Sequence, residues 1–334
     1  MPADGTGSPQ PRSNEPGSRI WMYSRDGEDA PVQIGSTFPE PGKDQLLWAD
    51  VDLESASELN PLWEQLGIES LVQGLNENED RPALIHHNGI MQLVVIGFRS
   101  EPDLEPMTLH CLVGANWVVT LHQDELDLVD QFNKPFNGET RLGDLDGPTF
   151  LSLVLDWQLS GYFKIIEGLQ SDIDRLDEDL LTKSPDEDAL LERLQSFRRR
   201  VRTLRNTLSA HREVLGLLSH PRSDAVVGAD AAGEYQRLEG RLQQAIDAVD
   251  TAREMIVGSF DIFMTRTSQA TNDIMKRLTI VSVLLLPAAA LAGIMGMNFK
   301  VAIFEWSWMF WVTIGLMLAV AGATLIVARR RNWL

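Results

Sequence analysis

Two long apolar runs near the C-terminal end of the sequence constrain the fold most strongly. The first is LTIVSVLLLPAAALAGIMGM at 278–297 and the second is WMFWVTIGLMLAVAGATLIVA at 308–328, and neither contains a charged residue. Each run has the length of about 20 residues that a helix needs to cross a bilayer. Apolar helices also occur in soluble cores, but two such runs joined by only ten residues favour a transmembrane hairpin.

Basic residues around the two runs predict the orientation of this hairpin. Lys276 and Arg277 precede the first run, whereas the connecting loop contains Lys300 as its only basic residue. The second run is followed by a basic cluster, Arg329, Arg330 and Arg331. Because basic residues concentrate on the cytoplasmic side of membrane proteins, we expect a multi-pass protein of the plasma membrane with both termini in the cytoplasm. In an assembly the three arginines would also form a basic collar at the inner mouth, near lipid headgroups.

The whole chain is acidic and divides into four regions. With 29 basic and 48 acidic residues the formal net charge is −19, which argues against a nucleic-acid partner and concentrates cations around the protein. Residues 1–18 are rich in Gly, Pro and Ser and predict a disordered tail. Residues 19–147 predict a cytoplasmic α/β domain, residues 148–277 a helical coiled-coil stalk, and residues 278–334 the hairpin with its basic tail.

The α/β domain is predicted from three segments rich in β-branched and aromatic residues and from one helix. Residues 55–68 begin with Ser55 followed three residues later by Glu58, a capping-box pattern typical of a helix start. The three segments predict strands of a largely antiparallel sheet: LLWADVDL at 46–53, IMQLVVIGF at 90–98 and ANWVVTLH at 115–122.

The stalk is predicted from apolar residues that alternate at spacings of four and three, the pattern of long helices packed as a coiled coil. No proline occurs between Pro221 and Pro287, so the second helix is expected to continue from Glu234 to Met297. Such a helix would be roughly 95 Å long at about 1.5 Å per residue. It would transmit a conformational change from the cytoplasmic part to the membrane part. The two apolar seams are Leu190, Leu194, Phe197, Val201, Leu204, Leu208, His211, Leu215 and Leu218, and Tyr235, Leu238, Leu242, Ala245, Val249, Ala252 and Ile256.

The same spacing, continued into the first apolar run, defines a stripe that suggests a pore. Polar groups in hydrocarbon are disfavoured unless they are satisfied, so hydroxyl and amide groups on this face favour a water-lined conduit between several copies of the chain. Close packing of helices through small and hydroxyl residues is the alternative. The stripe is Asp261, Thr265, Ser268, Asn272, Met275, Thr279, Ser282, Leu286, Ala289 and Gly293.

The first run ends in GIMGMNFK at 293–300. Gly296 is expected to end the helix in a left-handed conformation. Asn298 then lies at the outer mouth, either as a simple turn residue or as one member of a ring of amide oxygens that faces incoming ions.

These residues resemble the CorA-type divalent metal ion channels. The resemblance rests on the Gly-Met-Asn motif at Gly296, Met297 and Asn298, on Pro287, and on the hairpin and basic tail that end the chain in Trp-Leu; it extends more loosely to about residue 20. It implies a funnel-shaped homopentamer that takes up Mg²⁺, often with Co²⁺ or Ni²⁺, and closes when cytoplasmic Mg²⁺ binds between neighbouring subunits. Mg²⁺ is then both substrate and regulatory ligand, and no other cofactor is expected.

The resemblance also implies roles for particular residues. The three motif residues would form the selectivity filter, Met275, Leu278 and Leu286 an apolar gate, and Asn272 a polar pore position beneath it. Three of these four gate and pore positions lie on the stripe, and Leu278 neighbours it. Ala289 replaces a common pore threonine, and the outer loop NFKVAIFEWS lacks the usual Met-Pro-Glu-Leu pattern, so zinc transport by the same superfamily stays open.

Regulation is expected to use acidic residues at subunit boundaries, where a divalent ion would relieve repulsion between carboxylates. The candidate regulatory ligands are Glu101, Asp103, Glu105, Asp247 and Asp250, although a merely solvated acidic surface would have the same composition. Two other classes of protein compete with a channel. One is a membrane-anchored scaffold or sensor without ion flux; the other, an enzyme, is not expected because the sequence contains no nucleophile–base pair, metal-spacing cluster or phosphate-binding loop.

Overall fold

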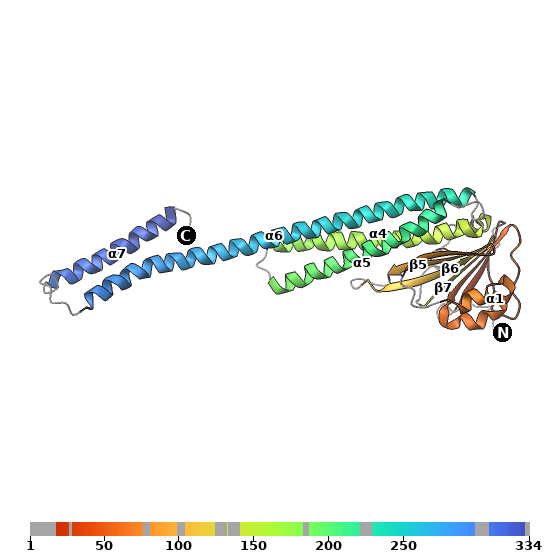
Figure 1. The fold of residues 1–334 in the computed structure, drawn as a ribbon, viewed down its shortest axis with the longest axis horizontal. Helices are drawn as coiled ribbons and strands as arrows, with labels where there is room; N and C mark the ends of the chain where they lie inside the picture. The colour runs from red at the N-terminus through yellow and green to blue at the C-terminus, as the bar shows by residue number, and fades with distance from the viewer. Residues whose placement is uncertain are drawn as a thin grey trace, which may run out of the picture. The chain divides into compact units, whose positions relative to one another are not determined.

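The computed structural model describes residues 18–26, 29–75, 81–98, 104–123, 132, 141–182, 187–220, 229–297 and 307–330. They belong to two compact units, Met1–Val257 and Gly258–Leu334. One long helix, α6 (Ala229–Met295), contributes residues to both units. Figure 1 shows the chain coloured from its N-terminus to its C-terminus.

A seven-stranded sheet forms the centre of the first unit. Its strand order is β2-β1-β3-β7-β6-β5-β4, and all neighbours are antiparallel except β3 and β7, which are parallel. The three predicted strands are β3, β5 and β7, with ends displaced by two residues or fewer. The strands are β1 (Arg19–Ser24), β2 (Ala30–Pro31), β3 (Gln45–Asp52), β4 (Ala83–His87), β5 (Ile90–Phe98), β6 (Pro106–Val113) and β7 (Trp117–His122).

The predicted helix at 55–68 begins earlier than expected and is divided in two. Asp52, not Ser55, caps it, because the Asp52 carboxylate accepts a hydrogen bond from the Glu54 amide at 3.0 Å. The chain then forms a 3₁₀ helix, η1 (Leu53–Leu59), before α1 (Asn60–Leu66) and α2 (Glu69–Gln73). Pro61 lies in the first turn of α1, where its missing N–H needs no partner, so the α-helix starts there and the capping-box prediction was wrong.

Helices cover both faces of the sheet in the first unit (Figure 1). The side chains of α1, such as Leu62 and Trp63, join a buried core with residues of β1, β3 and β7. On the other face, α4 (Gly147–Thr182) contacts β6 and β7, and α5 (Glu187–Ser219) contacts β4. Every residue of the two predicted seams on α5 and α6 is buried, so the seams are the buried faces of these helices, and their coiled-coil packing stays a prediction. A short 3₁₀ helix, η2 (Arg141–Asp144), precedes α4.

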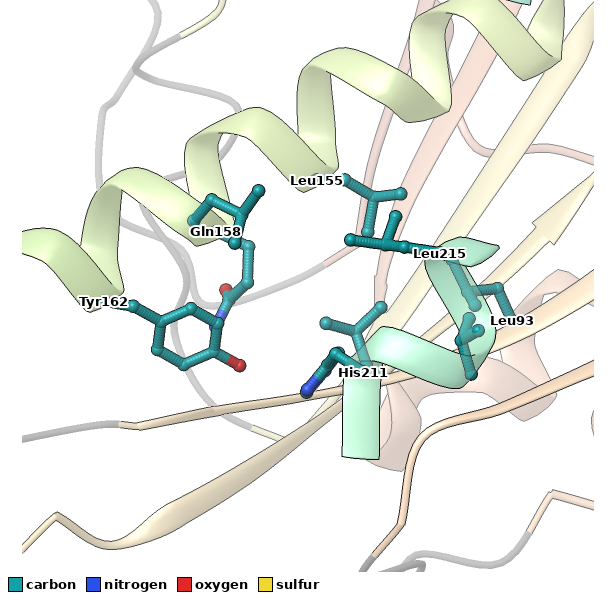
Figure 2. A pocket seen from close by; sticks show the side chains of 9 residues that line it. Leu93, Leu155, Gln158, Tyr162, His211 and Leu215 are labelled. Atoms are coloured by element: carbon teal, nitrogen blue, oxygen red, sulfur yellow. The ribbon is translucent and has the colours of Figure 1, made fainter. Parts of the chain in front are cut away.

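His211 attaches α5 to the sheet through a hydrogen bond to the main chain of β5. β4 pairs with β5 only as far as Val94, so Ile96 has no β4 neighbour. The Ile96 amide instead donates to His211 Nε2 at 3.1 Å, and the Tyr162 hydroxyl donates to the Ile96 carbonyl. Figure 2 shows Gln158 and Tyr162 of α4 and His211 of α5 extending into the same space, a cavity of ≈ 20 Å³ that has room for about one water.

The second unit contains the C-terminal part of α6 and the helix α7 (Ser307–Arg330). α6 is 67 residues long and includes Pro287. Among the described residues, α6 is the one helix whose length and composition suit a membrane crossing, and α7 holds a shorter apolar stretch, Phe310–Thr324. The fold class is therefore confirmed: an α/β domain, a long helix and a C-terminal apolar helix. The predicted boundaries at 147 and 277 stay predictions, and α6 crosses residue 277 without interruption.

Candidate functional site

The predicted stripe lies on an exposed face of α6. Its large apolar side chains are open to the surroundings, with Met275 55% exposed and Leu286 68% exposed. Leu278, beside the stripe, is 58% exposed. The other predicted pore residues in this part of α6 are also exposed, except Ser282, which is half-buried; they are Asn272, Thr279, Ala289 and Gly293. Within one chain, nothing in the described structure covers this face.

The opposite face of the same helix segment is less exposed than the stripe. Ile280 is buried and lies among half-buried neighbours, Leu284, Pro287, Ala288 and Leu291. At about 100° per residue, these positions fall on the side of α6 that is turned away from the stripe. In α7 the half-buried residues among those described are Thr313, Ile314, Met317, Val320, Ala321, Gly322 and Thr324.

Two hydroxyl groups of the stripe donate to their own helix. Thr265 Oγ1 donates to the Asp261 carbonyl at 2.8 Å, and Thr279 Oγ1 donates to the Met275 carbonyl at 2.7 Å. Such bonds to the carbonyl four residues earlier are common for threonine in helices. They satisfy the hydroxyl proton and leave the oxygen lone pairs on the exposed face.

The helix ends where the motif begins, but not in the predicted conformation. The Gly296 amide donates to the Ala292 carbonyl at 2.9 Å, and the Met297 amide donates to the Ile294 carbonyl at 3.2 Å. The second bond spans three residues instead of four and closes the last turn of the helix. Gly296 therefore needs no left-handed φ and has none. Met297 is 51% exposed, and Asn298 lies outside the described residues.

The candidate regulatory acids are not brought together within one chain. Glu105 and Asp247 are exposed, and Asp247 accepts a hydrogen bond from Gln243 Nε2 at 2.8 Å. Asp250 forms an ion pair with Arg205 at 2.8 Å, a contact that the sequence analysis missed. In the part of the chain that the structure describes, no three His, Cys, Asp or Glu side chains are placed to hold a metal ion. Glu101 and Asp103 lie outside that part.

Opposite charges on successive helices pair across the bundle. Arg200 of α5 contacts Asp172 of α4 at 3.4 Å, and Arg193 contacts Asp179 at the same distance. At the other end of the chain, Arg329 and Arg330 are exposed on the last turn of α7, and Arg331 lies beyond the described residues.

Comparison with known proteins identifies the family. Residues 43–330 match the model of the CorA-like Mg²⁺ transporter protein family. The chain belongs to this family. The predicted family is therefore confirmed, and with it the prediction of a divalent cation transporter.

Two curated relatives and one solved structure are similar to this member of the CorA-like family. The cobalt/magnesium transport protein CorA of Thermotoga maritima is 28% identical over 182 residues, 54% of this chain and 51% of that protein; the match thus spans about half of that relative. The protein of the same name from Methanocaldococcus jannaschii is 25% identical over 87% of this chain and 92% of its own. The complete structure of CorA magnesium transporter from that organism has a TM-score of 0.77 at 22% identity, over 95% of this chain and 98% of that one.

Proposed function

We propose that copies of this chain assemble as a homopentamer whose α6 helices surround a conduit for Mg²⁺. The observation that carries this proposal is the position of the stripe, which is exposed in the single chain and lies opposite the half-buried face of α6 around Ile280. A face that carries Asn272, Thr279 and Ser282 in an apolar helix would be costly against lipid. The cost is removed when the stripe of each copy faces the stripes of neighbouring copies across water.

Asn298 is the proposed outer selectivity element, together with Gly296 and Met297. Mg²⁺ dehydrates reluctantly and keeps several waters when it binds. A ring of neutral amide oxygens accepts hydrogen bonds from those waters, whereas a ring of carboxylates would hold a divalent ion more tightly and slow its release.

Met275, Leu278 and Leu286 are the proposed gate. Their side chains are large, apolar and exposed on or beside the stripe. Apolar constrictions of this kind block ions by excluding water when they are narrow. Ala289 and Gly293, nearer the end of α6, would leave the conduit wider.

The membrane potential is the proposed driving force. With both termini in the cytoplasm, Mg²⁺ moves inward, and a potential of about 100 mV favours a doubly charged ion by about 4.6 kcal/mol, since each charge contributes about 2.3 kcal/mol. The exposed Arg329 and Arg330, with Arg331, would form a positive collar at the inner mouth of the pentamer and contact lipid headgroups.

Cytoplasmic Mg²⁺ is the proposed regulatory ligand, and it would bind between subunits. The exposed Glu105 and Asp247 are the favoured ligands, with Glu101 and Asp103, which precede Glu105 closely in the sequence. Asp250 is a weaker candidate, because its ion pair with Arg205 already neutralises its charge. A divalent ion that relieves repulsion between such carboxylates stabilises the closed arrangement.

Flux into liposomes tests the proposal. Purified protein is expected to transport Mg²⁺, and the variant Asn298→Ala should assemble normally but lose transport. Asn206→Ala is the matched control, because Asn206 is an exposed amide on α5, far along the chain from the stripe. Transport of Zn²⁺ in preference to Mg²⁺, Co²⁺ and Ni²⁺ would indicate the zinc-transporting alternative. An assembled protein without flux of any of the four ions would indicate a scaffold or sensor.

A further inference from the structure

The helical layer formed by η1, α1 and α2 has an acidic outer face. Residues 53–75 contain glutamates but no lysine, arginine or histidine. The glutamates are all exposed, and no residue in the described part of the chain forms an ion pair with any of them. This acidic face consists of Glu54, Glu58, Glu64 and Glu69.

Helix α5 has a basic outer face. Residues 193–212 contain arginines but no aspartate or glutamate. Three of the arginines are paired within the chain, because Arg193, Arg200 and Arg205 contact aspartates of α4 and α6. The other arginines are exposed, and among the described residues none forms an ion pair with them. This basic face consists of Arg198, Arg199, Arg202 and Arg212.

The acidic face and the basic face cannot meet within one copy of the chain. α1 packs against β1, β3 and β7 on one face of the sheet, whereas α4 and α5 lie on the other face (Figure 1). Arg198 and Arg202 are four residues apart on α5, a spacing at which like charges repel. In a chain with a formal net charge of −19, an unpaired basic face fits a partner with an acidic surface, and a second copy presents one.

We propose that the acidic face of one copy binds the basic face of the next copy, so that the cytoplasmic parts contact each other head to tail around the ring. This inference rests on the proposed homopentamer. A contact between two different faces is heterologous, and its repetition about an axis can close a ring. Faces on opposite sides of one sheet suit this arrangement, whereas a two-fold dimer brings together the same face of both copies.

The contact is expected to set the register of neighbouring copies more than the strength of the assembly. Exposed ion pairs each contribute little and are screened by salt. Complementary charges nevertheless fix the register of two surfaces and disfavour wrong pairings, because like charges would then face each other. The contact should therefore weaken as the salt concentration rises.

Cross-linking between copies tests the inference in the full chain in lipid nanodiscs. The variant Glu58→Cys/Arg202→Cys carries one thiol on each face, while the native Cys111 is buried. Because the two faces lie on opposite sides of the sheet, a short bifunctional thiol reagent can join these thiols only between copies. We expect a ladder of cross-linked multiples of the chain on a denaturing gel. Glu58→Cys alone and Arg202→Cys alone are the matched controls and should give no ladder.

Charge reversal then tests whether the contact depends on these charges. Adding Arg198→Glu and Arg199→Glu to the double-cysteine protein should lower the cross-linked fraction by about tenfold, because attraction is replaced by repulsion at two positions. Adding Glu54→Arg and Glu64→Arg to that reversed protein should restore the fraction, because the two faces are then complementary again.

The outcomes are distinct. Loss of the ladder on charge reversal and its return in the fully exchanged protein would support the inference. A protein that transports Mg²⁺ but gives no ladder would overturn it while leaving the conduit in place. A ladder that survives charge reversal, or one that is lost and not restored by the exchange, would also overturn it. A monomeric protein without ion flux would overturn the proposed function together with this inference.

Discussion

Acidification is expected to weaken the attachment of α5 to the sheet through His211. The imidazole is buried, Nε2 accepts from the Ile96 amide at 3.1 Å, and Nδ1 lies 2.7 Å from the Thr207 carbonyl. Nδ1 therefore carries the proton of the neutral ring. Protonation of Nε2 would place its N–H against the Ile96 N–H, so that two donors face each other. It would also place a charge in an apolar site. Burial lowers the pKa of His211 from 6.5 to about 4.

The magnitude follows from the two pKa values. The unfolded chain, with a histidine pKa near 6.5, binds a proton before the folded chain does, so the folded state loses stability as pH falls. The contribution is fully present above pH 6.5 and is lost as pH falls to about 4. Between 6.5 and about 4 the loss is about 3 kcal/mol, at about 1.4 kcal/mol for each tenfold change in proton affinity.

The variant His211→Gln isolates this effect. Its side-chain oxygen can still accept from Ile96 but does not titrate. The free energy of unfolding is measured by denaturant titration at pH 7 and at pH 4, and hydrogen exchange of the Ile96 region is measured as well. Between the two pH values the variant should lose less stability than the wild type. His86→Gln, which replaces an exposed histidine on β4, should behave as the wild type does. An equal loss in His211→Gln and the wild type would refute the reasoning.

Three further predictions concern the gate, the sheet edge and regulation. Replacing the apolar Leu286 by Asn should raise resting Mg²⁺ leak several-fold in liposomes, because the constriction stays wet; unchanged leak would remove Leu286 from the gate. Tyr162→Phe leaves the Ile96 carbonyl without its buried donor, and should lower the free energy of unfolding by about 1–3 kcal/mol in denaturant titrations; no change would mean that another group replaces the hydroxyl. Asp247→Asn should raise the Mg²⁺ concentration needed for closure, whereas the same concentration in variant and wild type would leave Asp247 as a solvated surface residue.

The helical part of the fold could be predicted from the sequence because its pattern is local. The seams from Leu190 to Leu218 and from Tyr235 to Ile256 repeat without interruption, and all of their residues are buried. The start of the helical segment after β3 was harder to predict, because both Asp52 and Ser55 are residue types that cap helices. The end of β3 at Asp52 selects Asp52 as the cap. The parallel pairing of β3 with β7 depends on contacts between segments far apart in sequence, which no local pattern contains.

The candidate site divides in the same way. The stripe on α6 could be predicted from helical spacing, and the structure leaves it exposed, opposite the half-buried face around Ile280. The ion pair between Arg205 and Asp250 could not be predicted, because it depends on how α5 and α6 are aligned along their lengths. The role of Asn298 rests on the family resemblance, and the regulatory roles of Glu101, Asp103 and Glu105 rest on their charge; all of these roles stay predictions.

Accessibility of single cysteines in the membrane tests the central claim most directly, that the stripe of α6 borders water between copies. Thr279→Cys places a thiol on the stripe, and Leu284→Cys places one on the half-buried face opposite it. Cys111, the native cysteine, is buried. With a membrane-impermeant thiol reagent, the Thr279→Cys protein should react and lose Mg²⁺ flux, while the Leu284→Cys protein should do neither. Equal reactivity of the two, or an unreactive Thr279→Cys protein, would contradict a water-filled conduit along this face.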